Sequence, residues 1–463
     1  MAETADKADL GRNGMAPATR SIDDVLERPA MGRYRWGIYI ACGLLMALEG
    51  YDAYIVANLA PMIARTLSIP IPSMGFVFTA QSAGMAIGFY TIPILADRIG
   101  RRGIVLIGSA LFGMLTLVST MVDTLTGFTL VRFLAFVAMG GTMPNIVALA
   151  TEFLPGTRRG KLLTWLYIGH GLGASIAGLV GPSFVAFHSW QSAFWAGGAA
   201  LLLFVPFLYA RLPESCRYLI TRNPDDPRVG ATLRRIDPGF DYPPGTRFTT
   251  AEARTHGSPV AALFSDGRAG MTLLLWVAMG GALCAVATLT SWMPSYLHVL
   301  GGIDASTATR MSSVSALGAI AGPLLLTMLM KRLDMPASLM LISFLGFFAM
   351  AALTFAEAAH WLGWVLGFCF GLFVIGTQAG LNALAASSYP SSMRSTAIGW
   401  AGGIGRITSM IGPGLGGLML AAQLPAWWIY TAIASPLLLA SAGMLGFHLL
   451  QSGEPRKAAA TAG

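Results

Sequence analysis

The stretch Leu48-Glu49-Gly50-Tyr51-Asp52-Ala53-Tyr54 places two carboxylates inside an apolar run that extends from about residue 36 to residue 61. A run of this length can cross a bilayer. A charge at the centre of a membrane helix costs roughly 2.5–3.5 kcal/mol on insertion scales. Glu49 and Asp52 are three residues apart and therefore share nearly the same helix face. The pattern predicts a protonatable site that faces a water-filled path.

The composition of the chain is typical of a polytopic membrane protein. Of the 463 residues, 55% are hydrophobic and only 11% are charged, and the mean hydropathy is +0.63. Soluble domains carry roughly 25% charged residues. The formal net charge of +8 comes from Lys and Arg on one predicted side, and the exceptions are Arg65, Arg132, Arg310 and Arg406. This asymmetry orients a protein in a lipid bilayer and argues against nucleic-acid binding.

Apolar runs predict twelve membrane spans. The first six lie at about 36–61, 74–96, 104–122, 127–153, 162–184 and 193–212. The second six lie at about 271–297, 311–330, 337–357, 361–388, 395–421 and 427–450. We therefore predict the following organisation, with tails and linker on the cytoplasmic side: tail 1–35, bundle 36–212, linker 213–270, bundle 271–450 and tail 451–463. An even number of spans returns the chain to its starting face.

The two halves of the chain resemble each other. Pro155 and Arg159 follow the fourth span, and Pro390 and Arg394 follow the tenth, with the same spacing. A Gly-rich span comes next in both halves. A repeat in the same orientation, six spans apart, is typical of the two parallel halves of an alternating-access transporter.

The loop Leu95-Ala96-Asp97-Arg98-Ile99-Gly100-Arg101-Arg102 resembles the signature G-x-L-A-D-R-x-G-R-[RK] of the major facilitator superfamily, with Pro93 in place of the first Gly. The resemblance implies an all-α membrane protein in which twelve transmembrane helices form two pseudo-symmetric six-helix bundles. It also implies a monomer in the inner cell membrane, with both termini in the cytoplasm.

Four local motifs resemble one branch of that superfamily, the aromatic acid:proton symporters. They are Ile22-Asp23 with Glu27-Arg28-Pro29, then Glu49-Gly50-Tyr51-Asp52, the segment 132–145 and the segment 389–413. The second motif is D-G-[FY]-D in that branch, so Glu49 replaces an Asp. The resemblance implies proton-coupled uptake of a small aromatic carboxylate, such as a benzoate or hydroxybenzoate, by alternating access.

Three ionisable residues are the candidates for proton coupling. Two carboxylates in a low-dielectric medium resist being ionised together, so Glu49 and Asp52 are predicted to bind the coupling proton. Asp52 is favoured because it matches the family residue unchanged. Arg132 is predicted to release the proton when it approaches the carboxylate. The alternative interpretation is a structural ion pair with no role in transport.

The candidate substrate site centres on Arg406, which lies well inside the eleventh predicted span. A guanidinium presents a planar fork that fits a carboxylate, so we predict that Arg406 captures the acid group of the substrate. The alternative is a role in helix packing. Six further side chains could line the cavity or serve only in packing, and these are Asn145, His170, Trp292, Gln378, Asn382 and Trp400.

Residues near the basic loops are the candidates for a cytoplasmic gate. They are Asp97, Arg98, Gly100, Arg101, Glu152, Arg158, Arg159 and Arg394. A carboxylate such as that of Asp97 can pair with arginines or with a helix N-terminus and so hold one conformation closed.

Other chemistries find little support in the sequence. The four cysteines form no C-x-x-C pair, so neither a metal site nor a disulfide framework is predicted. The segment 412–417 spells G-x-G-x-x-G, but it lies in a membrane span with no preceding strand. No P-loop or catalytic constellation is present. We predict no enzyme activity and no cofactor, with the proton as coupling ion.

Three alternative functions stay open at this point. The chain could take up another organic anion, such as muconate or a dicarboxylate. It could export compounds by proton-driven efflux. It could also be a membrane sensor that binds a ligand without moving it.

Overall fold

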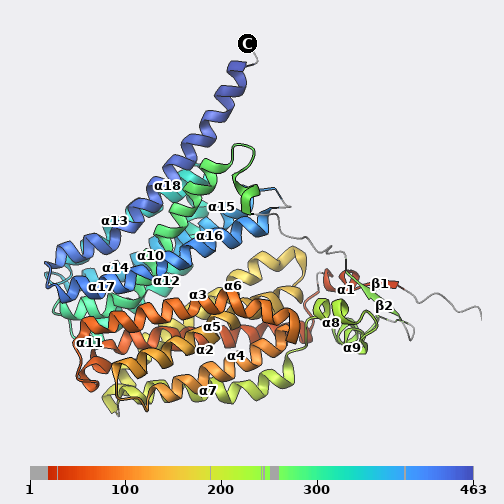
Figure 1. Ribbon diagram of the computed structural model, residues 1–463, viewed down its shortest axis with the longest axis horizontal. Coiled ribbons are helices and arrows are strands. Elements are labelled where there is room, and N and C mark those ends of the chain that lie inside the picture. The colour runs from red at the N-terminus through yellow and green to blue at the C-terminus, as the bar shows by residue number, and fades with distance from the viewer. Residues whose placement is uncertain are drawn as a thin grey trace, which may run out of the picture.

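The computed structural model describes residues 19–28, 30–187, 189–240, 242, 246–250, 260–390 and 393–461. Side chains are described in these ranges except at residue 97, 184–187, 379, 395 and 452–461. Long helices dominate and form two bundles that lie side by side (Figure 1). The side chain of Asp97, a predicted gate residue, therefore lies outside the described part.

The first bundle contains six helices: α2 (Arg33–Thr66), α3 (Met74–Ile99), α4 (Arg101–Ser119), α5 (Leu125–Glu152), α6 (Arg159–Phe187) and α7 (Trp190–Arg211). Helix α3 packs along α5, and α2 packs along α6. The α3–α5 contact depends on Gly88, because a Cβ there would lie 2.0 Å from the Val137 carbonyl oxygen. Small residues bring membrane helices together in this way. Short 3₁₀ turns η1 (Ile71–Ser73) and η2 (Gly156–Arg158) connect helices in this half.

The second bundle also has six spans, but four of them consist of more than one element. Its first and last spans, α10 (Ala269–Val299) and α18 (Ala426–Thr461), are uninterrupted. The composite spans are α11 (Ala305–Ser313) with α12 (Ser315–Leu329), α13 (Met335–Ala351) with η4 (Ala352–Phe355), α14 (His360–Cys369) with η5 (Phe370–Ile375) and α15 (Gly376–Ser387), and α16 (Arg394–Ser409) with α17 (Ile411–Ala421). Segment η5 is a π-helical turn inside its span.

The predicted twelve-helix fold is confirmed. Ten segments of the described ranges are long and apolar enough to cross a membrane. Helix α3, with 26 residues, and the pair α16–α17 complete the set of twelve. The eighth span begins at Ala305, earlier than the predicted residue 311, because the Asp304 side chain accepts hydrogen bonds from the backbone N–H groups of Ser306 and Thr307. Such a cap stabilises a polar first turn.

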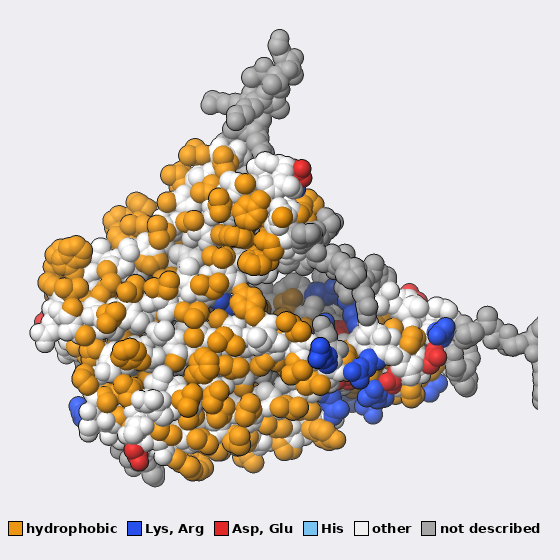
Figure 2. All heavy atoms as spheres, viewed as in Figure 1, with side chains coloured by type: hydrophobic (Ala, Val, Ile, Leu, Met, Phe, Trp, Pro, Cys, Tyr) orange, Lys and Arg blue, Asp and Glu red, His pale blue; other side chains and the backbone are white. Residues whose placement is uncertain are grey.

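In the described part of the chain, the two bundles share a hydrophobic cluster toward one end. There, Phe78 of α3 meets Trp292 of α10 edge-on with ring centroids 5.2 Å apart. At the other end each bundle has its own hydrophobic cluster. Lys and Arg side chains gather at that end beside a hollow between the bundles (Figure 2). We call it the basic end, and the packed end the closed end.

A small polar module lies at the basic end of the first bundle (Figure 1). It contains β1 (Thr19–Ser21), α1 (Asp23–Leu26), α8 (Cys216–Arg222), α9 (Pro227–Ile236) and β2 (Arg247–Thr249). Strand β1 pairs with β2 in parallel, Thr19 opposite Arg247. The 3₁₀ turn η3 (Val260–Phe264) leads into the second bundle. The predicted N-terminal tail is thus folded at residues 19–28.

Burial explains why this short segment is ordered. The side chains of Ile22, Val25 and Leu26 are at most 1% exposed and join the hydrophobic cluster of the first bundle and linker. The Arg35 guanidinium donates hydrogen bonds to the backbone carbonyls of Val25 and Leu26 at 2.7 and 2.8 Å. An apolar contact and a buried guanidinium together fix the segment to the start of α2.

Candidate functional site

Asp52 and Arg132 form a buried ion pair between α2 and α5. The Arg132 guanidinium lies 3.4 Å from Asp52 Oδ2, and both residues are at most 2% exposed. Thr116 of α4 donates a hydrogen bond to the same carboxylate oxygen at 2.7 Å. The rings of Phe136 and Phe194 flank the guanidinium, with centroids 5.3 and 5.5 Å from its carbon. The hydrogen bonds and the ion pair together join α2, α4 and α5 at this point.

Sequence reasoning missed Thr116 in this cluster. A single threonine in an apolar span ordinarily bonds the carbonyl of its own helix, and its sequence context carries no sign of a partner 64 residues away. The position of α4 against α2 makes it a ligand of Asp52.

Glu49 has a very different environment, although it shares a helix face with Asp52. Its side chain is completely buried, and neither carboxyl oxygen has a hydrogen-bond partner among the residues that the structure describes. Within the described ranges it also has no salt bridge to an Arg, Lys or His. An isolated ionised carboxylate in such a place costs several kcal/mol. The neutral, protonated carboxyl is therefore the favoured form of Glu49 here.

His170 of α6 lies directly against the segment that carries both carboxylates. A Cβ on Gly50 would fall 2.1 Å from the His170 carbonyl oxygen, so glycine permits this approach. The imidazole meets the Tyr54 ring edge-on, with centroids 6.1 Å apart. Its Nδ1 atom is buried, and no described group forms a hydrogen bond with it. His170 thus packs against α2 at both Gly50 and Tyr54.

Arg406 of α16 reaches from the second bundle to the first. Its guanidinium carbon stacks over the Phe89 ring of α3, 3.9 Å from the centroid. The phenols of Tyr90 and Tyr167 lie close enough to interact with its charge. No acidic side chain in the described part of the chain forms a salt bridge with it. Aromatic rings stabilise a guanidinium but leave its N–H donors free for an anion.

Two of the other predicted cavity residues are buried in packing contacts. Trp292 is fully buried at the closed end, where its Nε1 donates to the Pro413 carbonyl at 2.8 Å and its ring stacks on Tyr296. Asn145 is 4% exposed, and its Nδ2 donates to the Gly141 carbonyl of its own helix at 2.8 Å. In this conformation both side chains donate their hydrogen bonds to backbone carbonyls of the protein.

The remaining predicted cavity residues lie on α15 and α16. Trp400 is 44% exposed and stacks on Trp276, with ring centroids 6.1 Å apart. Gln378 is half-buried and Asn382 is exposed. Neither amide hydrogen-bonds to another residue that the structure describes, so both are free to meet a ligand.

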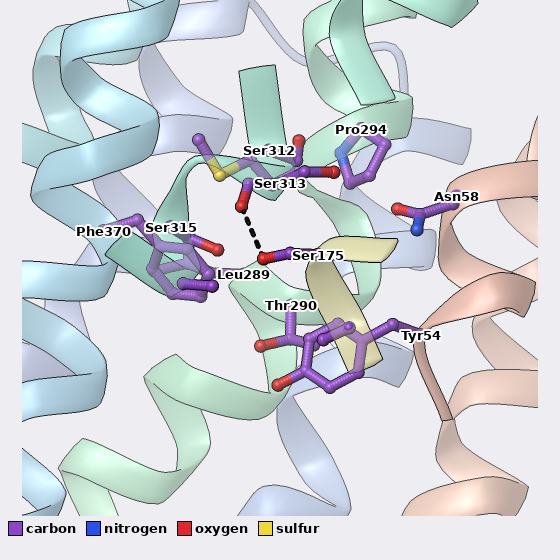
Figure 3. Close-up of a pocket in the computed structure, with 13 residues that line it drawn as sticks. Tyr54, Asn58, Ser175, Leu289, Thr290, Pro294, Ser312, Ser313, Ser315 and Phe370 are labelled. Carbon is purple, nitrogen blue, oxygen red and sulfur yellow. Dashed lines mark hydrogen bonds between the residues drawn. The ribbon is translucent and has the colours of Figure 1, made fainter. Parts of the chain in front are cut away.

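A small cavity lies between the bundles near the middle of the spans (Figure 3). Its volume is about 20 Å³, enough for one water molecule. Its polar lining includes Tyr54, Asn58, Ser175, Thr290, Ser312 and Ser313. Sequence reasoning named none of these, because serines and threonines are common in membrane spans and their convergence from different helices has no local signal.

At the basic end, Gly100 makes the turn between α3 and α4. Its φ of 91° suits glycine, and a Cβ there would fall 2.2 Å from Glu214 Oε2. The Glu214 carboxylate accepts from the backbone N–H of Arg102 at 3.0 Å. The Arg98 carbonyl accepts from the Tyr218 hydroxyl at 2.9 Å. The predicted loop signature is thereby tied to the start of the linker.

Glu152 holds the end of α5 to the same linker. Its carboxylate accepts from the Ser215 hydroxyl at 2.6 Å and from the backbone N–H of Arg217 at 3.0 Å. Arg101 lies 3.6 Å from it. Two residues of the predicted gate, Arg101 and Glu152, therefore meet on the first bundle.

The other gate candidates separate into paired and unpaired arginines. Arg159 forms a salt bridge of 2.7 Å with Glu27 of the N-terminal segment. Arg158 and Arg394 are exposed, and neither has an acidic partner among the residues that the structure describes. The ionic contacts of the predicted gate residues thus lie on the first bundle, the N-terminal segment and the linker.

Comparisons with known proteins agree with this fold. A family model described as Major Facilitator Superfamily matches residues 42–402 and 302–462. The chain is 29% identical to a gallate transporter of Pseudomonas putida, with 92% of this chain and 94% of that protein covered. It is 28% identical to a benzoate transport protein of Acinetobacter baylyi, with 90% and 91% covered.

Two further similarities support the same assignment. The chain is 31% identical to a 3-(3-hydroxy-phenyl)propionate transporter of Escherichia coli, with 88% of this chain and 92% of that protein covered. Among solved structures, a D-xylose-proton symporter matches with a TM-score of 0.67 at 17% identity, with 89% and 97% covered. At that identity the structural match shows the fold alone. Because the family model spans most of the chain and these relatives align over nearly all of it, the chain belongs to the major facilitator superfamily and is a multi-pass membrane transporter, not an enzyme.

Proposed function

We propose that this protein takes up a small aromatic carboxylate together with protons. The proposal rests on the environment of Arg406. This half-buried residue reaches from the second bundle to the first and has no acidic partner in the described ranges. A carboxylate fits its free N–H donors bidentately. The Phe89 ring beneath it and the nearby phenols of Tyr90 and Tyr167 suit an aromatic ligand. The printed names of the relatives, gallate and benzoate transporters, are consistent with this class.

Proton coupling is assigned to Glu49, Asp52 and Arg132. Glu49 is buried without a partner, so it holds its proton in this conformation. Asp52 lies 3.4 Å from the Arg132 guanidinium and accepts a hydrogen bond from Thr116. In the other conformation, Arg132 withdraws from Asp52, and the vacated carboxylate binds a proton. The pair thereby links helix movement to protonation.

The basic end is assigned to the cytoplasm by the positive-inside rule. A membrane potential that is negative inside opposes entry of a monovalent anion by about 2.3 kcal/mol per 100 mV. One proton carried with the acid cancels that charge, and a second makes entry favourable. Because the bundles are packed at the closed end, this conformation is the one from which proton and acid leave to the cytoplasm.

Uptake by cells that express the protein tests the proposal. The labelled panel contains benzoate, hydroxybenzoates, protocatechuate, muconate and a sugar, each with and without a protonophore. We expect accumulation of an aromatic acid that collapses with the protonophore. Uptake of muconate alone would point to another organic anion, and no uptake by a protein shown to reach the membrane would refute the proposal.

A pair of variants connects this assay to the site. Arg406→Ala should raise the KM for the transported acid at least tenfold, since an ionic hydrogen bond is worth about 1.5–3 kcal/mol. The control is Arg332→Ala, which removes an exposed arginine from the loop between α12 and α13. An unchanged KM in Arg406→Ala would reject carboxylate capture by this residue.

A further inference from the structure

The eleventh span is broken, whereas its counterpart in the first half of the chain is continuous. The fifth span is a single helix, α6, although Pro182 lies inside it. The eleventh span consists of α16, which leads to the basic end, and α17, which lies at the closed end, and the two meet at Met410 (Figure 1). Pro413 has no backbone N–H to donate to the Ser409 carbonyl, so one helical hydrogen bond cannot form beside the break. Helices bend sharply at such places.

Two hydroxyl groups beside the break bind backbone carbonyls of α16. The Thr408 hydroxyl lies 2.9 Å from the Gly405 carbonyl oxygen and 2.9 Å from that of Gly280 on α10. The Ser409 hydroxyl donates to the Arg406 carbonyl at 2.7 Å. Hydrogen bonds from serine and threonine to the preceding turn compete with the helix and often bend it. The backbone around Met410 is therefore easier to bend than a regular helix.

Helix α17, on one side of the break, is held by backbone contacts. A Cβ on Gly417 would fall 2.6 Å from the Pro72 carbonyl oxygen, and a Cβ on Gly75 would fall 3.3 Å from the Gly417 Cα. The Trp292 Nε1 atom donates to the Pro413 carbonyl at 2.8 Å. Backbone atoms in such close contact separate only when a whole helix moves. Helix α17 is thus fixed to both bundles at the closed end.

Helix α16, on the other side of the break, meets only the ends of side chains at its glycines. A Cβ on Gly403 would fall 2.2 Å from the Tyr90 hydroxyl oxygen. A Cβ on Gly405 would fall 2.2 Å from a terminal methyl group of Leu283. At Gly399 it would meet no atom within 4 Å. Side-chain ends can rotate away, so these contacts leave α16 room to move.

The counterpart of α16 in the first bundle has no such freedom. A Cβ on Gly173 of α6 would fall 1.8 Å from the Ala47 carbonyl oxygen of α2, which is a backbone contact. At the start of α6, Arg159 forms its 2.7 Å salt bridge with Glu27 of the N-terminal segment. Arg394 has the equivalent place at the start of α16, and no acidic side chain in the described ranges pairs with it. The N-terminal segment therefore restrains α6, whereas α16 has no comparable ionic restraint among the described residues.

We propose that α16 is a hinged gate helix, which swings at Met410 away from α3 and carries Arg406 with it while α6 and α17 keep their positions. The inference rests on the proposed function, in which Arg406 holds the acid, and it adds how the acid is released. In this structure the Arg406 guanidinium lies 3.9 Å from the Phe89 ring centroid. The swing separates these groups and opens the site to the hollow at the basic end (Figure 2).

The length of α16 sets the size of the expected movement. Gly399 precedes Met410 by 11 residues, which corresponds to about 16 Å of helix. A bend of about 20°, the lower limit of a sharp kink, moves Gly399 by about 5 Å. A second bundle that moves as one rigid body leaves every distance within it unchanged. Distances inside the second bundle therefore distinguish a hinge from rigid-body motion.

Spin-label distances within the second bundle test the hinge. Leu273→Cys on the exposed face of α10 is combined with Gly399→Cys on α16 or, as the control, with Leu418→Cys on exposed α17. The four native cysteines are replaced by alanine. The distances are measured at acidic and alkaline pH, with and without benzoate and 4-hydroxybenzoate. We expect the 273–399 distance to shift by about 5 Å or to show two populations, and the 273–418 distance to stay constant. A single, unchanged 273–399 distance in every condition would overturn the hinge.

Pro413→Ala gives a second test, because alanine supplies the N–H that the Ser409 carbonyl lacks. The variant should reduce the 273–399 shift and lower the maximal uptake rate about fivefold, the value of one hydrogen bond of ordinary strength. KM should stay near the wild-type value, since Arg406 is intact. The matched control is Pro182→Ala in continuous α6, which should leave the rate unchanged.

The two proposals fail in different ways. If Pro413→Ala keeps the wild-type rate and shift, or if Pro182→Ala lowers the rate equally, the hinge is rejected while aromatic acid uptake stands. If the wild type accumulates no aromatic acid, the proposed function fails. The spin-label distances then still decide whether α16 bends.

Discussion

Replacing Arg132 by Met leaves the Asp52 carboxylate buried without its countercharge. The two groups are 3.4 Å apart and almost completely removed from solvent. Breaking such a pair from one side costs about 3–5 kcal/mol, because the remaining charge stays in a low-dielectric interior. The 2.7 Å hydrogen bond from Thr116 persists and offsets part of that loss. We therefore expect a destabilisation of about 3 kcal/mol.

Thermal unfolding of the purified protein in detergent measures this effect. For a cooperative unit the size of one bundle, about 3 kcal/mol lowers Tm by roughly 6–12 °C. The double variant Arg132→Met with Asp52→Asn removes both charges and retains a side chain that can accept from Thr116. Its Tm should recover most of the loss, which corresponds to a coupling energy of about 2 kcal/mol.

The comparison of single and double variants decides the outcome. Asp52→Asn alone completes the cycle, and Arg65→Ala controls for the loss of an exposed arginine on the same helix as Asp52. If the effects of the two single changes simply add in the double variant, the residues are not energetically coupled. The assignment of Arg132 as the partner of Asp52 would then be wrong.

Two other variants test the neighbouring assignments. Glu49→Gln replaces a neutral carboxyl by a neutral amide of similar shape, so the free energy of unfolding should fall by no more than about 1.5 kcal/mol. Uptake by this variant should lose its sensitivity to the protonophore. Retained concentrative uptake would remove Glu49 from the coupling mechanism. Arg35→Met removes the donors that hold residues 25 and 26. Limited proteolysis should then cut the segment 19–28 faster than in the wild type, whereas Glu27→Ala, which breaks a half-exposed pair worth about 0–1 kcal/mol, should change the rate little.

Much of the architecture could be predicted from the sequence because membrane insertion depends on local composition. Each span satisfies its own backbone hydrogen bonds, so an apolar run of sufficient length is a helix whatever its neighbours are. The same reasoning identified Glu49, Asp52, Arg132 and Arg406, since an ionisable residue within a span is costly wherever it points. The eighth span was predicted too short because its first turn is polar and depends on the Asp304 cap.

The partners of those residues could not be predicted in the same way. Asp52 and Thr116 are 64 residues apart, and Asp52 and Arg132 are 80 apart. A hydrogen bond requires atoms within about 3 Å, and that depends on how each helix is rotated and placed. The order of residues along the chain does not directly encode the rotation and placement of each helix.

Glu49 and Asp52 best illustrate the difference between what residue order predicts and what helix packing adds. The order of residues is sufficient to place two carboxylates inside the first span, three residues apart on one helix face. Helix packing brings a guanidinium and a hydroxyl to Asp52, whereas no described group bonds the carboxyl of Glu49. The free-energy cost of burying a charge depends on one residue and its span. The interactions that offset this cost come from groups that packing brings from distant helices.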